Sequence, residues 1–238
     1  MAGLVCALFA VGLAIRSGQG AAPQRTVGLF TTLPILWRET HDLGELLSDD
    51  TPPHWAQARL AAHGRLQPLD TLAGQSGTLP LPGDALLVMA QPRGLSPAEN
   101  VALDDWVRAG GDVLLFADPL LTSDSAFAIG DRRRPQDVVL LSPILARWGL
   151  ELQFDEDQPE GERAVPLLGG EISVNLPGRF VAHGADCRLL ADGLAARCRI
   201  GAGNVLVVAD AALLEVGMAG EEAVRSGTLD RLLSQFPG

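Results

Sequence analysis

The clearest hydrophobic pattern in the chain is a strand, a helix and a second strand between residues 85 and 117. The continuous apolar run ALLVMAQ at 85–91 is typical of a strand buried on both faces. The segment SPAE at 96–99 combines a helix N-cap, a proline at the first helical position and a glutamate three residues after the cap. A Gly-Gly pair at 110–111 ends this helix, and the apolar run DVLLFA follows at 112–117. This succession predicts a βαβ unit and therefore a parallel sheet.

Other segments continue the alternation of strands and helices. The apolar runs at 26–32 and 204–210 predict two more buried strands, and turn signals between 164 and 200 predict antiparallel hairpins. The remaining predicted elements are helices at 54–63, 142–148 (with Ser142 as cap) and 221–236 (with Val224, Leu229, Leu232 and Leu233 apolar), strands at 65–72 (an edge strand) and 150–154, and a helical piece within the loop 35–52. The predicted fold class is α/β, a mostly parallel sheet flanked by helices, in one domain at 26–238.

Composition and charge narrow the range of functions. The 238 residues are 47% hydrophobic and 20% charged, a balance typical of a globular protein. The net charge of −11 leaves little basic surface to neutralise phosphates, so we expect no nucleic-acid partner. Every basic residue apart from the histidines is arginine, and the absence of lysine excludes Schiff-base and P-loop chemistry.

The amino-terminal segment Met1–Ile15 carries no charged side chain and is almost wholly apolar, and Arg16 ends it. As a helix it would reach roughly 22 Å, against a hydrocarbon core of about 30 Å. Three interpretations stay open: a membrane anchor, a secretory signal cut near 19–22, and a buried helix. We adopt the interpretation as a membrane anchor. Its segment is 1–22, and residues 1–15 lie in the membrane. The predicted location is the cell membrane, with the bulk of the chain facing the periplasm. Secretion to the periplasm is the alternative.

Two cysteines flank a strong hairpin signal. If Asp192 and Gly193 form the turn, Cys187 falls opposite Cys198 on neighbouring antiparallel strands, within the range of a disulfide. We predict this disulfide, which would imply an oxidising compartment, with two reduced core thiols as the alternative.

Candidate chemistry lies where the buried strands end, because ligands of open α/β sheets bind outside the carboxyl ends of the strands. Polar residues stand at these ends: Thr31, Thr32, Gln91, Asp118 and Asp210. Asp118 and Asp210 could form a carboxylate pair for a metal or a sugar, as in a hydrolase or a carbohydrate-binding module, or they could close the strand ends as Asx turns. Neither has a histidine or cysteine near it in sequence, and we predict no metal site and no cofactor.

Nucleophilic catalysis has little support, because no G-x-S-x-G or G-x-C-x-G elbow follows any predicted strand. We therefore predict no catalytic residue. The run Arg132, Arg133 and Arg134 is either a solvated loop or a docking site for an acidic partner or a lipid headgroup. The acidic segment 155–162 is expected to be a solvated turn.

Several motifs resemble those of one known group of domains. The residues that carry the resemblance are Leu95, Ser96, Glu99, Ala102, Leu103, Asp104, Gly110, Gly111, Asp118 and Pro119, followed by the helix-Gly-strand SPILARWGLEL and then by Gly201, Gly203, Val205 and Asp210. This pattern resembles the GldG-like auxiliary domains of ABC-type transport systems, which have a class I glutamine amidotransferase-like fold. The resemblance covers roughly residues 26–215.

The resemblance implies a domain without catalytic activity. In true amidotransferases the strand after the Gly-Gly turn leads to a catalytic cysteine, whereas this chain has Ala117, Asp118 and Pro119 there. The resemblance further implies an extracytoplasmic binding or assembly domain tethered to a membrane. Its partners would be membrane proteins such as transporter subunits.

Overall fold

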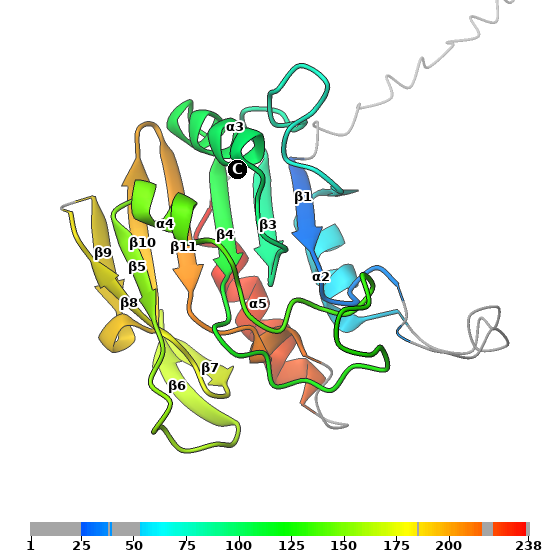
Figure 1. Cartoon of the computed structure of the whole chain (residues 1–238), viewed down its shortest axis with the longest axis vertical. Coiled ribbons are helices and arrows are strands. Elements are labelled where there is room, and N and C mark those ends of the chain that lie inside the picture. Colours follow the sequence, from blue (N-terminus) through cyan, green and yellow to red (C-terminus); the bar gives the residue numbers. More distant parts are fainter. Residues whose placement is uncertain (1–24, 38, 40–52, 185, 216–220, 237–238) are drawn as a thin grey trace, which may run out of the picture.

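A computed structural model describes residues 25–37, 39, 53–184, 186–215 and 221–236 of the chain. These residues form three layers, in which a seven-stranded sheet lies between two layers of helices (Figure 1). Two further pairs of strands lie beside this sheet. The predicted helical piece within 35–52 falls largely outside the described residues.

The large sheet has the strand order β2-β1-β3-β4-β11-β10-β9. The strands are β1 Thr26–Thr31, β2 Arg65–Pro68, β3 Leu86–Ala90, β4 Asp112–Phe116, β5 Leu150–Gln153, β6 Arg163–Leu167, β7 Gly170–Val174, β8 Arg179–Ala182, β9 Cys187–Leu190, β10 Ala195–Ile200 and β11 Gly203–Val208. From β2 to β11 each neighbouring pair is parallel, whereas β10 pairs antiparallel with both β11 and β9. The small antiparallel sheets are β5–β8 and β6–β7. The α/β prediction, with its parallel sheet and antiparallel hairpins, is confirmed.

Helices cover both faces of the sheet. They are α2 Trp55–His63, α3 Pro97–Arg108, α4 Ser142–Arg147 and α5 Glu222–Leu233, with two short 3₁₀ turns, η1 Ala191–Gly193 and η2 Ala212–Leu214. Alternate residues of β3 point to opposite faces: Leu86 and Val88 pack in one cluster with α2 and α5, and Leu87 and Met89 in the other with α3 and α4. Each central strand is therefore buried on both sides, which explains its continuous apolar run.

One predicted detail of the helices is wrong. Ser142 is the first residue of α4 rather than its cap, and Leu141 precedes the helix without a side-chain hydrogen bond. Of the four apolar residues of the predicted helix 221–236, Val224 is 68% exposed, and Leu229, Leu232 and Leu233 are buried. Arg225 and Thr228 are buried in its place. Both hydrogen-bond to residues outside the helix, so α5 buries polar side chains that tertiary contacts satisfy.

Asp104, one of the motif residues of the sequence, connects α3 to the neighbouring helix. Asp104 is fully buried and accepts hydrogen bonds from Arg108 Nε at 2.8 Å, from Trp148 Nε1 at 3.1 Å and from Arg147 Nε. Burial alone would raise the pKa of Asp104, but the two guanidinium groups outweigh it and hold the pKa below its ordinary value. Asp104 therefore links α3 to α4 through these hydrogen bonds.

No helix within the described ranges is both long and apolar enough to cross a membrane. This finding corrects the sequence-based predictions of a transmembrane helix and of a cell-membrane location facing the periplasm. The segment 1–22, on which those predictions depended, lies outside the described residues.

Cys187 and Cys198 lie opposite each other in the β9–β10 pair and form a disulfide. The strands have the register that the hairpin signal predicts, although four residues connect them, Ala191 to Leu194, instead of two.

We expect Asp104→Asn to lower the free energy of unfolding by about 1–3 kcal/mol, because the buried side chain loses the charge that the half-exposed Arg108 and Arg147 contact. Urea unfolding followed by circular dichroism measures this change. Asp105→Asn is the matched control, since Asp105 is the exposed neighbour of Asp104 on the same helix. Equal losses of free energy of unfolding in the two variants would contradict the proposed link between α3 and α4.

Reduction of the disulfide should also destabilise the protein. The bond closes a segment of 11 residues, for which the chain-entropy model gives about 3 kcal/mol. Urea unfolding with and without a phosphine reductant should show a loss of this order. The double variant Cys187→Ser/Cys198→Ser should show a similar loss and no response to reductant, and a reductant effect on that variant would refute the assignment.

Candidate functional site

The five polar residues predicted at the strand ends all lie at the carboxyl edge of the large sheet. Thr31 ends β1, Gln91 follows β3, and Asp118 and Asp210 each stand two residues beyond β4 and β11. In Figure 1 the arrows of β3, β4 and β11 point toward this edge, where the long loop after β4 and the β6–β7 hairpin also lie. Four neighbouring parallel strands thus bring these residues to one side of the molecule.

Gln91 extends the sheet beyond its last backbone pairs. Its side-chain Oε1 accepts from the Asp118 N–H at 2.9 Å, and its Nε2 donates to the Asp118 carbonyl at 3.1 Å and to the Gln136 carbonyl at 2.8 Å. The side-chain amide thereby takes the place of a peptide group in the ladder. Gln91 is fully buried and has a φ of 42°, which turns the chain out of the strand.

The two threonines join the same network. Thr31 Oγ1 donates to the Ala90 carbonyl at 2.7 Å, and Thr32 Oγ1 donates to the Gln91 carbonyl. Thr32 Oγ1 also accepts from the Gln136 N–H at 2.9 Å. Thr32 therefore fastens the loop after β4 to the end of β1.

Both carboxylates accept backbone hydrogen bonds at each of their oxygens. Asp118 binds the N–H groups of Leu120 at 2.9 Å and Ala211 at 3.0 Å, and so ties β4 to the segment after β11. Asp210 binds the N–H groups of Ala212 at 2.6 Å and Asn175 at 2.9 Å. These contacts are those of Asx turns and cross-links between segments.

Burial governs the protonation of these groups. Burial, with a smaller effect from the charge of Glu215, raises the pKa of Asp118 to about 6. Burial and then the neighbouring Asp118 raise the pKa of Asp210 well above its usual range. Burial also raises the pKa of Glu215, and Arg225 opposes that rise. Three acidic groups therefore share this edge, and full ionisation of all three is unfavourable.

This acidic trio does not have the arrangement of a metal centre. Among the described residues, no group of three or more His, Cys, Asp or Glu side chains is placed to hold a metal ion. The carboxyl groups of Asp118 and Asp210 can accept hydrogen bonds from backbone N–H groups and can retain a proton. Asp118 and Asp210 are 0% and 1% exposed, so a water or substrate could contact either carboxylate only after the residues that cover it had moved.

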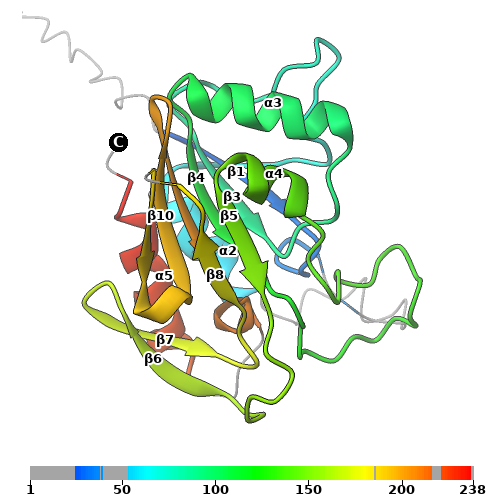
Figure 2. The ribbon, with the colours of Figure 1, turned by 60° about the vertical axis from the view of Figure 1, so that its left-hand side comes forward.

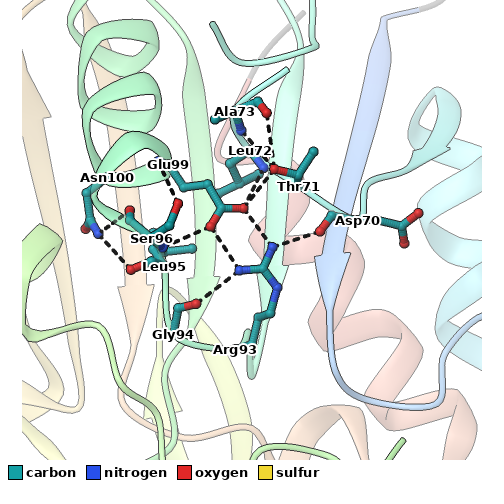
Figure 3. Close-up of polar contacts among 10 residues, drawn as sticks. All are labelled: Asp70, Thr71, Leu72, Ala73, Arg93, Gly94, Leu95, Ser96, Glu99 and Asn100. Carbon is teal, nitrogen blue, oxygen red and sulfur yellow. Dashed lines mark hydrogen bonds and ion pairs between the residues drawn. The ribbon is translucent and has the colours of Figure 1, made fainter. Parts of the chain in front are cut away.

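A polar cluster around Glu99 lies beyond β3, and only part of it was predicted. Ser96 and Glu99 form the predicted capping box. Arg93 adds a two-pronged ion pair to Glu99, at 2.7 and 2.9 Å, which the sequence pattern did not indicate (Figure 3). Glu99 also accepts from Thr71 Oγ1 at 3.0 Å and from the Leu72 N–H at 3.1 Å. The hydrogen bonds from Arg93 hold the pKa of Glu99 far below its usual range, and the cluster anchors the segment 70–73 to α3.

The arginine run of the loop after β4 does not act as one cluster. Arg133 pairs with Asp131 at 2.7 Å and lies over the Phe127 ring, and Arg134 pairs with Asp137 at 2.8 Å. Arg132 is exposed. Two of the three guanidinium groups thus hold the loop in shape.

Two adjacent hollows lie beside the segment 154–160. One measures about 450 Å³ and the other about 430 Å³, and both are lined by Phe154 and Gln158. The segment 175–179 separates them from the end of β11, because the Gly178 N–H donates to the Ala209 carbonyl at 2.7 Å. Periodicity did not reveal these hollows, since their walls come from turns that are distant in sequence.

A family model described as a domain of unknown function, DUF4350, matches residues 54–229. The chain belongs to the DUF4350 family. The match covers the chain from α2 through β11 and the greater part of α5 but not β1, so Gln91, Asp118 and Asp210 lie within the family domain while Thr31 and Thr32 lie outside it. A search of curated proteins gives no match.

Solved structures share the fold at low sequence identity. The exo-β-1,4-mannosidase Op5Man5 from Opitutaceae bacterium strain TAV5 is 14% identical with a TM-score of 0.53, over 88% of this chain and 36% of the mannosidase. The mmIFT52 N-terminal domain is 12% identical with a TM-score of 0.51, over 88% of this chain and 97% of that domain. STM1381 from Salmonella typhimurium LT2, described as a cytoplasmic protein, is 12% identical with a TM-score of 0.53, over 90% of this chain and 100% of that protein. These likenesses show the fold alone, and the chain spans about a third of the mannosidase.

The raised pKa of Asp118 predicts a specific dependence of stability on pH. Because the folded carboxyl, with a pKa of about 6, binds its proton more tightly than the unfolded one, its contribution to stability is greatest below pH 4 and decreases as the pH rises to about 6. We expect the free energy of unfolding of the wild type to fall, relative to Asp118→Asn, by up to about 3 kcal/mol between pH 4 and pH 7. Urea unfolding at several pH values measures the difference.

Asp157→Asn is the control, because Asp157 is exposed. The control should follow the pH dependence of the wild type. A parallel pH dependence in wild type and Asp118→Asn would show that Asp118 ionises normally in the folded state.

Proposed function

We propose that this chain is a non-catalytic binding or assembly domain that contacts a partner protein through the loops at the carboxyl edge of its sheet. One observation carries the proposal. The polar side chains predicted there as a site bind backbone groups of the chain itself, while the loops of the same edge present large apolar side chains to solvent.

The exposed apolar residues are concentrated in these loops. Of the eight large hydrophobic side chains that are exposed among the described residues, five lie in the segments that follow β1 and β4: Trp37, Leu120, Ile129, Val138 and Leu140. Ile129 is 88% exposed and Leu140 is 58% exposed. Single exposed apolar residues are common in soluble proteins, but their concentration in neighbouring loops is typical of an interaction surface.

These loops are held in place. The Gln136 N–H donates to Thr32 Oγ1 at 2.9 Å, and Ser125 Oγ donates to the Glu39 carboxylate. The loop after β4 is thus joined to the segment after β1 at two points. Prior ordering of a surface reduces the entropy lost when a partner binds.

The resemblance to GldG-like domains suggests an accessory of an ABC-type transport system as the specific form of this function. The shared motif residues support a common fold, because Glu99 and Asp104 both have structural contacts here. A transporter subunit would then be the partner.

The surface itself can be tested by substitution. Ile129→Ser/Leu140→Ser should weaken the capture of a candidate transporter subunit by at least tenfold, since both side chains would lose the apolar area buried against the partner. Val224→Ser/Leu189→Ser is the matched control, because these exposed side chains lie on α5 and β9, away from the loops. Binding is measured with purified proteins, and urea unfolding checks that both variants stay folded. Equal binding by the wild type and both double variants would refute a role for these loops.

A hydrolase that uses Asp118 and Asp210 is the second candidate. The observation in its favour is the raised pKa of both carboxyls, a feature of general acids at active sites. A carbohydrate-binding module at the same edge would use the same residues. Screens with glycoside substrates and a glycan array test both. Hydrolysis that Asp118→Asn and Asp210→Asn each abolish, in proteins shown to be folded, would replace the non-catalytic proposal.

A further inference from the structure

The larger of the two hollows is lined by turns and strand ends from four separate parts of the chain. Its walls are formed by Gln153, Phe154, Asp155, Gln158, Arg163, Val165, Pro177, Gly178, Arg179, Ala191 and Leu194. The volume of about 450 Å³ lies within the range of small-molecule sites. Figure 2 shows β6, β8 and the turn between β9 and β10 together at this end of the molecule.

Two arginines line this hollow in a strongly acidic chain with a net charge of −11. No ion pair within the described residues involves Arg163 or Arg179; Arg163 only approaches Gln158 Oε1, at 3.5 Å. The arginines that join elements elsewhere, such as Arg93, have carboxylate partners. Asp155 is the acidic residue of the lining, so the two guanidinium groups exceed the carboxylates by one charge.

The stem of Arg179 is held against the neighbouring turn. A Cβ atom at Gly193 would lie 2.8 Å from Arg179 Cγ and 2.8 Å from the Phe180 carbonyl oxygen. The absence of a side chain at Gly193 therefore lets the stem of Arg179 pack across the turn. Packing of the stem reduces the freedom that the guanidinium group would lose on binding a ligand.

The same turn has an uncommon backbone conformation. Ala191 and Asp192 have φ values of 46° and 53°, in the left-handed region that residues with side chains seldom adopt. The Cys187–Cys198 disulfide closes the hairpin that contains this turn. Ala191 and Leu194 both line the hollow, so the strained turn is one of its walls.

The adjacent hollow has the opposite charge. Glu156 and Glu160 line it, together with Pro119, Leu120 and Leu176. An anion is therefore favoured on the arginine side of the segment 154–160 and disfavoured on the other side.

We propose that the arginine-lined hollow binds a small organic anion. Arg163 and Arg179 would contact its carboxylate or phosphate group, and Phe154, Val165 and Leu194 would contact an apolar body. Guanidinium groups suit both anions because they donate parallel hydrogen bonds to pairs of oxygens. This site is separate from the loops of the proposed function, and neither depends on the other.

Three probes of similar shape test the proposal on the full chain: phenyl phosphate, benzoate and the neutral benzyl alcohol. Titrations followed by the backbone amide signals of Gly178 and Gly193 should show saturable binding of at least one anion. Benzyl alcohol should bind at least tenfold more weakly. Comparison of the two anions shows which acid group the site prefers.

The double variant Arg163→Gln/Arg179→Gln should weaken anion binding at least tenfold. Arg65→Gln/Arg188→Gln changes the net charge equally at exposed arginines outside the lining and should stay within about twofold of wild type. No saturable binding of either anion up to about 10 mM, or an equal loss in both double variants, would overturn the proposal. Either result leaves the test of the loop surface unaffected, because that test measures capture of a protein by other residues.

Discussion

The network at the carboxyl edge is the constraint on which the rest of the structure depends. A parallel sheet cannot close its strand ends with tight hairpins, so every strand must leave the edge by a longer connection whose backbone groups need partners. In this protein Gln91, Asp118 and Asp210 supply those partners from their side chains. The two aspartates therefore stay buried, and burial raises their pKa values.

Arginine supplies the complementary set of cross-links. Arg25 illustrates the pattern at the opposite edge of the sheet, where it pairs with Asp112 at 2.5 Å and donates to the Asp84 and Phe236 carbonyls at 2.7 and 2.9 Å. One guanidinium group thereby joins the starts of β1 and β4 to the end of the chain. A lysine carries all its N–H donors on one nitrogen, whereas these contacts of Arg25 come from three different nitrogens. This geometry is consistent with a chain that contains arginine and no lysine.

Local signals in the sequence predicted the parts of the fold that local physics decides. The capping box at Ser96 and Glu99, the buried runs of β3 and β4, and the register of Cys187 opposite Cys198 all depend on residues that are close in sequence. The positions of the five strand-end residues also followed, because parallel strands end at the same edge.

The parts that the sequence did not predict depend on contacts between distant segments. Arg225 is buried in α5 because Glu162, 63 residues earlier, pairs with it at 2.7 Å. The helical pattern gave no sign of this burial, since an arginine is normally exposed. The arginine-lined hollow is a similar case, because its walls meet only after the hairpins have packed.

The position of the hairpins explains why the strand ends and the hollows have different roles. The segment 175–179 binds directly to the end of β11, through the Asn175 N–H to Asp210 at 2.9 Å and the Gly178 N–H to the Ala209 carbonyl. This segment uses the hydrogen-bonding capacity of the strand end, where a ligand would otherwise bind. It also forms one wall of each hollow, through Leu176 on one side and Pro177 on the other. The hollows that could hold a ligand therefore lie beside the hairpins that cover the strand ends, and not at the strand ends themselves.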